Sequence, residues 1–177
     1  MGSAEPPSFT LEPGKDGRAV LLTWSREALD PADPETVKEE PRSPWSVEGE
    51  VDWDRAEALR LVSALFEDGR ELAVAAIRPR DAAGHDAETL GSHLVEEGEA
   101  VAVEEALLST EYDAGGLPRR LGLELWLDSE RPPLRVSADR EGEPRVSGEG
   151  VRRQTTRMSF QLGGIAGSGL YEVLRPA

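Results

Sequence analysis

The sequence predicts an all-β, antiparallel fold of about eight or nine strands, arranged as a closed barrel or as a sandwich. Apolar and polar residues alternate along several segments, which is the period of a strand with one buried face. Turn signals rich in glycine, proline and aspartate recur about every 8 to 12 residues, a spacing typical of antiparallel barrels and sandwiches. Strands and helices do not alternate regularly, which disfavours a parallel nucleotide-binding sheet.

Residues 1–18 are expected to form an extended or disordered lead-in. They are rich in proline, glycine and charge, and a proline opposes a helix because it lacks the amide hydrogen. The remaining residues, 19–177, are enough for one domain, since single domains usually hold roughly 100 to 200 residues. We therefore expect a single β-barrel domain over 19–177.

Two strands and a loop are predicted before residue 54. Residues 19–24 form a short apolar run, which indicates a strand. Residues 30–44 contain four prolines among acidic residues, so this segment is expected to be a surface loop. Residues 45–53 alternate between tryptophan, valine or glycine and serine, glutamate or aspartate, which predicts a half-buried strand.

The dipeptide Asp68-Gly69 is the strongest hairpin signal in the chain. It separates apolar arms at 58–67 and 70–78, and an Asp-Gly loop fits a type I′ turn, in which both central residues have positive φ. The arms are apolar on both faces over part of their length, so each face is expected to meet a further layer or a partner. A helix over 56–66 is the alternative, because alanine, leucine and glutamate favour helices, but the adjacent turn disfavours it.

Residues 79–98 are predicted to be a polar loop with a short helix at 87–95. They contain both histidines of the chain, His85 and His93. A zinc site needs at least three ligands with supporting geometry, so this spacing favours a solvated loop. We predict no metal and no cofactor.

The second half of the chain has the clearest alternation. A hairpin is predicted between 100–112 and 119–127, and in its second arm the leucines at the odd positions from 121 to 127 share one face. A short strand is expected at 135–139.

The C-terminal part of the chain is predicted to form two more strands. Residues 150–161 alternate, with Met158 and Phe160 on one face, and 170–175 form the final strand. The glycine-rich segment 163–169 between them is expected to be a flexible loop. It does not predict a phosphate-binding loop, because it opens a strand and no helix.

Composition excludes several classes of protein. Lys+Arg number 20 against 35 Asp+Glu, which gives a formal charge of -15. Such a charge repels phosphate backbones and anionic lipids, so neither nucleic acid nor a membrane is expected as a partner. The chain has no cysteine, which excludes disulfides and cysteine-ligated metals. It shows no signal-peptide pattern and no apolar run long enough to cross a membrane, so a cytoplasmic location is expected.

The candidate site residues are polar side chains that alternate with apolar ones on the late strands. If they face inward they must be paired, because an isolated buried charge is costly. Glu172 is the candidate acid of a catalytic site in an apolar cavity, with Arg157 as its partner across the final hairpin. The alternative is a set of outward-facing salt bridges. The predicted ligand-binding residues are Trp126, Glu124, Arg153, Gln161, Tyr171 and Phe66.

The C-terminal part of the chain resembles a known family. The segments EALLSTEYDAGGLPRRLGLELWLD, PLRVSAD and GSGLYEVLRP are similar to the lipocalin-like domains of the AttH and carotenoid 1,2-hydratase (hydroxyneurosporene synthase) superfamily. The family's Gly-x-Gly-x-x-Glu ending corresponds to Gly167, Gly169 and Glu172. The resemblance covers about residues 45–175.

This resemblance implies a calycin-type barrel with a cavity for a small hydrophobic molecule, terpenoid-like or polyketide-like. Members of the family commonly carry two such domains in tandem, and 177 residues hold one, so a homodimer is expected or the fold alone is shared. Three functions remain open: binding of such a molecule, its cofactor-independent hydration, isomerisation or cyclisation by acid catalysis, or a structural or partner-binding role.

Overall fold

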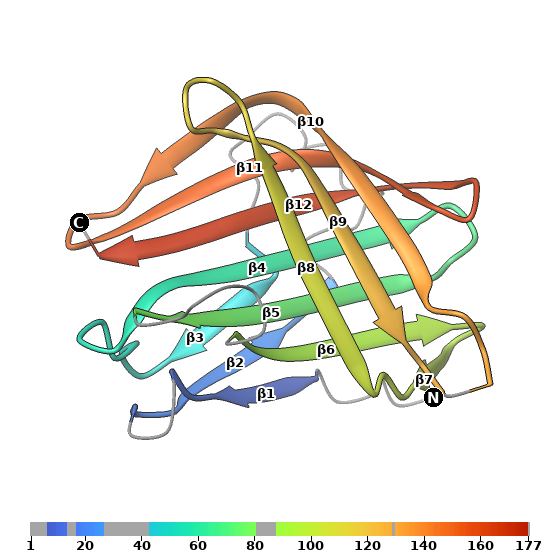
Figure 1. Ribbon diagram of the computed structural model, residues 1–177, viewed down its shortest axis with the longest axis horizontal. Helices are drawn as coiled ribbons and strands as arrows, with labels where there is room; N and C mark the ends of the chain where they lie inside the picture. The colour runs from blue at the N-terminus through green and yellow to red at the C-terminus, as the bar shows by residue number, and fades with distance from the viewer. Residues whose placement is uncertain (1–6, 14–16, 27–42, 81–87, 129, 177) are drawn as a thin grey trace.

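The computed structural model describes residues 7–13, 17–26, 43–80, 88–128 and 130–176, and these form twelve β-strands and no α-helix. Nine strands make one sheet and three make another, and the strand pairs among the described residues are antiparallel. Figure 1 shows how the two sheets lie. The predicted all-β, antiparallel class is confirmed.

The small sheet has the order β1 (Ser8–Leu11), β2 (Val20–Trp24) and β3 (Trp45–Glu48). Strand β1 lies inside the segment expected to be a lead-in, and it pairs along its length with β2. Strand β3 is shorter than predicted, because Gly49 adopts a φ of 83°, which ends the extended conformation. The loop expected at 30–44 lies almost wholly outside the described residues.

The large sheet curls into a half-barrel (Figure 1). The strands in spatial order are β7 (Glu99–Val101), β6 (Thr89–Glu96), β5 (Glu71–Pro79), β4 (Ala56–Phe66), β12 (Ile165–Pro176), β11 (Val151–Leu162), β10 (Leu134–Ser147), β9 (Pro118–Trp126) and β8 (Glu105–Tyr112). Strands β8 and β9, at one end of this order, cross in front of β4 to β6 in Figure 1, and β8 comes into contact with β6.

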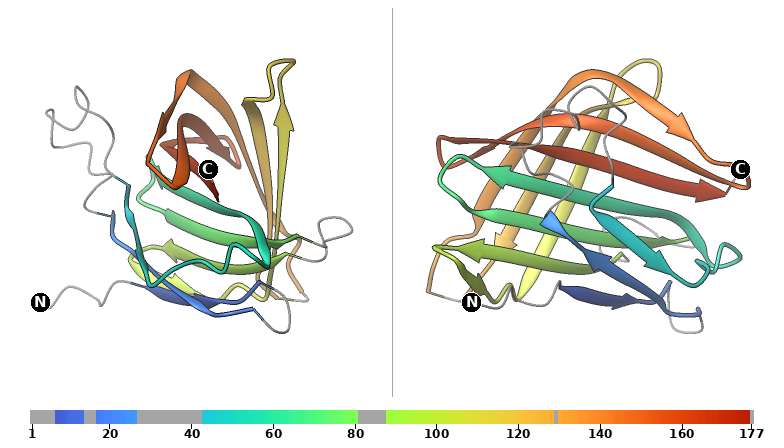
Figure 2. Two further views of the ribbon diagram at one scale, coloured as in Figure 1. Left: turned by 90° about the vertical axis from the view of Figure 1, so that its left-hand side faces the viewer. Right: turned by 180° about the vertical axis from the view of Figure 1, so that it is seen from behind.

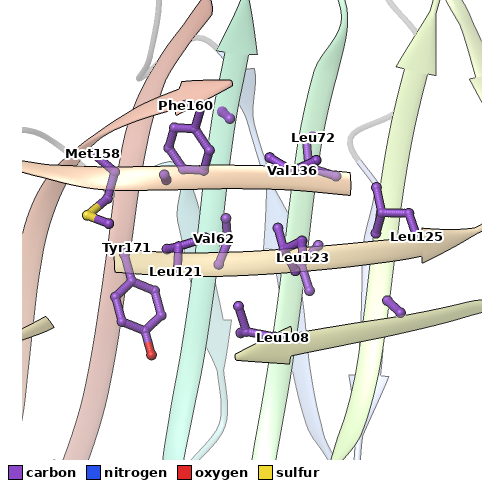
Figure 3. Packing of buried hydrophobic residues seen from close by; sticks show 14 of the residues in the cluster. Val62, Leu72, Leu108, Leu121, Leu123, Leu125, Val136, Met158, Phe160 and Tyr171 are labelled. Carbon is purple, nitrogen blue, oxygen red and sulfur yellow. The ribbon is translucent and has the colours of Figure 1, made fainter. Parts of the chain in front are cut away.

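Strands β4 and β5 are buried on both faces, as the sequence predicts for the arms of this hairpin. Their concave face packs against β8 to β11 in one apolar cluster, of which Figure 3 shows a part. Their convex face packs under the small sheet in a second cluster (Figure 2). The leucines at 121, 123 and 125 all belong to the concave cluster, which confirms their shared face. The molecule therefore has three layers and two cores.

Two turns differ from their predicted forms. At the β4–β5 hairpin only Gly69 has positive φ, and its amide donates to the carbonyl of Phe66 (3.0 Å). This is a type I turn followed by a left-handed glycine, so the type I′ prediction was wrong. Between β11 and β12 the turn is only Gly163-Gly164, both with positive φ, and it joins the paired residues Leu162 and Ile165. The rest of the predicted loop is strand.

The prediction of a polar loop with a short helix before residue 98 was also wrong. Residues Thr89–Glu96 form strand β6, which pairs with β5 over its length. Pairing to a neighbouring strand overrides local helix propensity. The sequence pattern of one segment does not show which other strand it will pair with. His93 lies on this strand, and His85 lies outside the described residues.

Candidate functional site

The predicted site residues lie on both faces of the large sheet. Successive residues of a strand point to opposite faces, so the odd and even positions of β12 separate. Tyr171 and Phe66 face the concave core. By the same alternation, the other six lie on the opposite face: Glu124 and Trp126 on β9, Arg153, Arg157 and Gln161 on β11, and Glu172 on β12.

Glu172 is fully buried on the convex face, in a polar cluster that joins the two sheets. The hydroxyl of Ser43 donates to Glu172 Oε2 (2.8 Å), and Arg153 Nε lies 3.0 Å from Glu172 Oε1. Arg153 Nη2 also donates to Ser43 Oγ (3.1 Å). The ion pair of Glu172 is thus made with Arg153, and the register places Arg157 opposite Leu170.

Burial raises the pKa of Glu172 above its usual 4.5, and the neighbouring Arg153 and Ser43 only partly offset this effect.

Strand β4 also places a buried hydroxyl, that of Ser63, on the convex face of the large sheet. Ser63 Oγ accepts hydrogen bonds from the indoles of Trp24 (3.2 Å) and Trp45 (2.9 Å), two residues of the small sheet. These contacts attach the small sheet to the large one.

A pocket of about 400 Å³ opens at one end of the half-barrel. Here β4 begins, while β5, β8 and β12 end, so side chains far apart in the sequence meet. Strand β12 reaches this end beside the C-terminus in Figure 1. We call it the Arg60 pocket; it is lined by Glu57, Ala58, Arg60, Arg78, Thr110, Tyr112, Gly116 and Arg175.

Arg60 is the buried centre of this pocket's polar wall. Its Nη1 donates to Thr110 Oγ1 (3.1 Å), and its Nη2 donates to Glu88 Oε1 and to the carbonyl of Leu108. The hydroxyl of Tyr171 shares a hydrogen bond with Thr110 Oγ1 (3.1 Å). Burial by itself lowers the pKa of Arg60, but Tyr171 and Glu88 outweigh it and the pKa is raised, so the guanidinium stays charged.

The sequence carries a signal for Arg60 that the alternation of the late strands does not include. Arg60 is the one charged residue inside the apolar segment 58–66, at a position whose neighbours two residues away, Ala58 and Val62, face the concave core. A lone charge in such a run must be paired or must serve a ligand. Its partners are Glu88, just before β6, and residues of β8 and β12, which the sequence does not bring together.

Two predicted ligand-binding residues line other pockets. Glu124 lies in a shallow pocket of about 420 Å³ over Gly122, on the outer face of β8 to β10. Phe66 lies in a pocket of about 450 Å³ at the β4–β5 turn, together with Arg26 and Glu71. Tyr171 is joined to the Arg60 pocket through Thr110. The predicted residues therefore do not form one site.

Within the described ranges, no group of three or more histidine, cysteine, aspartate or glutamate side chains is arranged to hold a metal ion. His93 is half-buried beside Trp24, with ring centroids 5.9 Å apart, and burial lowers its pKa. No helix in the same ranges has the length and apolar character that a membrane crossing requires.

Comparison with known proteins places the chain in no family: no family model matches the sequence, and no curated protein matches it either.

Proposed function

We propose that the protein binds a small hydrophobic molecule, terpenoid-like or polyketide-like, in the Arg60 pocket. The observation that carries this proposal is the position of the pocket, on the concave side of a curled antiparallel sheet and next to a buried polar network. Concave pockets that combine apolar walls with a few converging polar groups are the usual ligand sites of proteins.

Packing of the core limits the size of the ligand. Leu121, Leu123 and Phe160 are almost fully buried in the concave cluster, so side chains fill the half-barrel beyond the pocket. A volume of about 400 Å³ equals that of about 13 water molecules in the liquid, at about 30 Å³ each, so it suits a compact molecule. The ligand would lie at the end of the half-barrel, with Ala58 and the ring of Tyr112 beside its apolar part.

The family resemblance of the C-terminal strands supports the same class of ligand. The curled, antiparallel all-β sheet is compatible with a lipocalin-like fold. Membership of the AttH and carotenoid 1,2-hydratase superfamily is part of the proposal, and it rests on the three sequence segments that carry the resemblance.

Acid catalysis by Glu172 is the second candidate function, and one observation favours it: the pKa of this buried carboxyl is raised. Its polar contacts among the described residues, however, are with Ser43 and Arg153, at the junction of the two sheets. The Arg60 pocket lies on the other face of the large sheet. We therefore propose ligand binding first, with a structural role for Glu172.

Binding can be tested with the neutral probe N-phenyl-1-naphthylamine, which becomes fluorescent in apolar surroundings. The wild type should bind it, and Tyr112→Ala should weaken binding about tenfold through the loss of an apolar wall. Trp126→Ala is the matched control, because Tyr112 and Trp126 are both partly exposed aromatic residues (46% and 36%) on neighbouring strands.

Trp126→Ala should bind the probe as the wild type does, because Trp126 lies on the outer face of β9. Loss of binding in Trp126→Ala, with Tyr112→Ala unaffected, would move the ligand to that outer face. A wild-type protein that leaves the probe dark would refute binding of a small hydrophobic molecule.

A further inference from the structure

We propose that the Arg60 pocket recognises a carboxylate on its ligand, so that the molecule bound is a small hydrophobic acid. This inference rests on the proposed binding function and adds the chemical class of the ligand. The charges that line and surround the pocket support it, although the chain as a whole is strongly acidic, with a formal charge of -15.

Cations outnumber anions at the pocket. Its described lining contains Arg60, Arg78 and Arg175 but one carboxylate, that of Glu57. Arg78 Nε donates to Glu57 (3.2 Å), and Arg60 is paired with the buried Glu88. Counted over the described residues, three arginines against two glutamates leave one positive charge without a compensating carboxylate.

Arg175 carries that uncompensated charge. Among the described residues no acidic side chain forms an ion pair with it. The residue directly opposite Arg175 on β11 is Arg152, which likewise has no ion pair in the described part of the chain. Like charges directly opposite each other on neighbouring strands are destabilising, so a bound anion would relieve this repulsion.

Arg60 supplies a second, independent observation. It is only 5% exposed, it lines the pocket, and its Nε is buried without a hydrogen-bond partner among the described residues. A buried donor left without a partner costs free energy, so it is a feature that a ligand oxygen would correct. Thr110, also in the lining, adds a hydroxyl beside it.

A carboxylate fits this arrangement better than a diphosphate does. It carries one negative charge, which matches the single uncompensated positive charge. Its two oxygens also match the planar fork of donors on a guanidinium group. The apolar remainder of the ligand would then lie along Ala58 and the ring of Tyr112.

The test compares two molecules that differ only in the head group, geranic acid and geraniol, as competitors for bound N-phenyl-1-naphthylamine at pH 8. The wild type should release the probe at an acid concentration about tenfold lower than the alcohol concentration. Arg175→Gln should abolish this preference by weakening the acid alone. Arg175 is exposed, so this variant is expected to fold, and its thermal melting curve checks this.

Arg120→Gln is the matched control, since Arg120 is an exposed arginine on the outer face of β9, 3.8 Å from Asp139. It should keep the full preference for the acid. Equal potency of acid and alcohol on the wild type, or equal effects of the two substitutions, would overturn the carboxylate site while leaving ligand binding intact. A wild-type protein that binds no probe and neither competitor would instead overturn the binding function and the carboxylate site with it.

Discussion

Glu172 illustrates how a single buried carboxylate can have a charged and a polar neighbour and still resist ionisation. Its carboxylate has a hydroxyl and a guanidinium beside it, yet burial outweighs both and its pKa is raised. Since the folded protein holds this proton more tightly than the unfolded chain, the contribution of Glu172 to stability is fully present below the ordinary pKa of 4.5. It is lost as the pH rises through the raised pKa.

Glu172→Gln should remove this pH dependence, because glutamine does not ionise. We expect the free energy of unfolding of the wild type, relative to that of Glu172→Gln, to decrease as the pH rises from about 4.5 toward neutrality. Urea unfolding at a series of pH values measures this difference. Glu124→Gln, at a partly exposed residue, is the control and should show a smaller trend. A difference that grows with pH would mean that the ion pair with Arg153 outweighs burial.

At the scale of elements, β12 is the strand on which close packing depends most. It lies between β4 and β11 in the middle of the large sheet, and its glycines bring it close to β4. A Cβ atom on Gly169 would overlap the carbonyl oxygen of Ser63, and one on Gly167 would lie 2.6 Å from the ring of Phe66. The glycines that resemble a family ending therefore also have a packing role in this sheet.

Gly169→Ala should destabilise the protein by about 1–3 kcal/mol, since the atom it meets belongs to the backbone, which cannot rotate away. Gly122→Ala in β9 is the matched control. The nearest atom to its added Cβ is the hydroxyl of Ser109 at 3.3 Å, which can rotate, so the change should be below about 1 kcal/mol. Chemical unfolding of both variants gives the comparison, and equal losses would show that β12 has room to shift.

For the molecule as a whole, the excess of negative charge is the dominant electrostatic feature. The formal charge is -15, while many of the ion pairs in the described residues involve exposed side chains. Exposed pairs contribute only about 0–1 kcal/mol each, so general repulsion should outweigh them.

Added salt should therefore raise the melting temperature. Raising NaCl from about 0.02 M to about 0.5 M shortens the screening length to a few ångströms, which weakens the repulsion between carboxylates on different strands. Differential scanning calorimetry at the two concentrations measures the shift, and sodium sulfate at equal ionic strength shows whether a specific anion effect adds to it. A lower melting temperature at high salt would mean that the surface ion pairs dominate stability.

The sequence by itself determined the class of the fold and the alternation of each well-patterned strand. Leucines at every second position of β9 predict one buried face, and the leucines at 121, 123 and 125 are indeed buried together. Only the tertiary structure decided what covers each face. Glu172 and Tyr171 are adjacent in the sequence, yet Glu172 meets Ser43, just before strand β3 of the small sheet, and Tyr171 meets Thr110 on the opposite face. The Arg60 pocket was likewise decided by the tertiary structure. Alternation is a local property of one strand, whereas a pocket depends on which distant strands the curled sheet brings together.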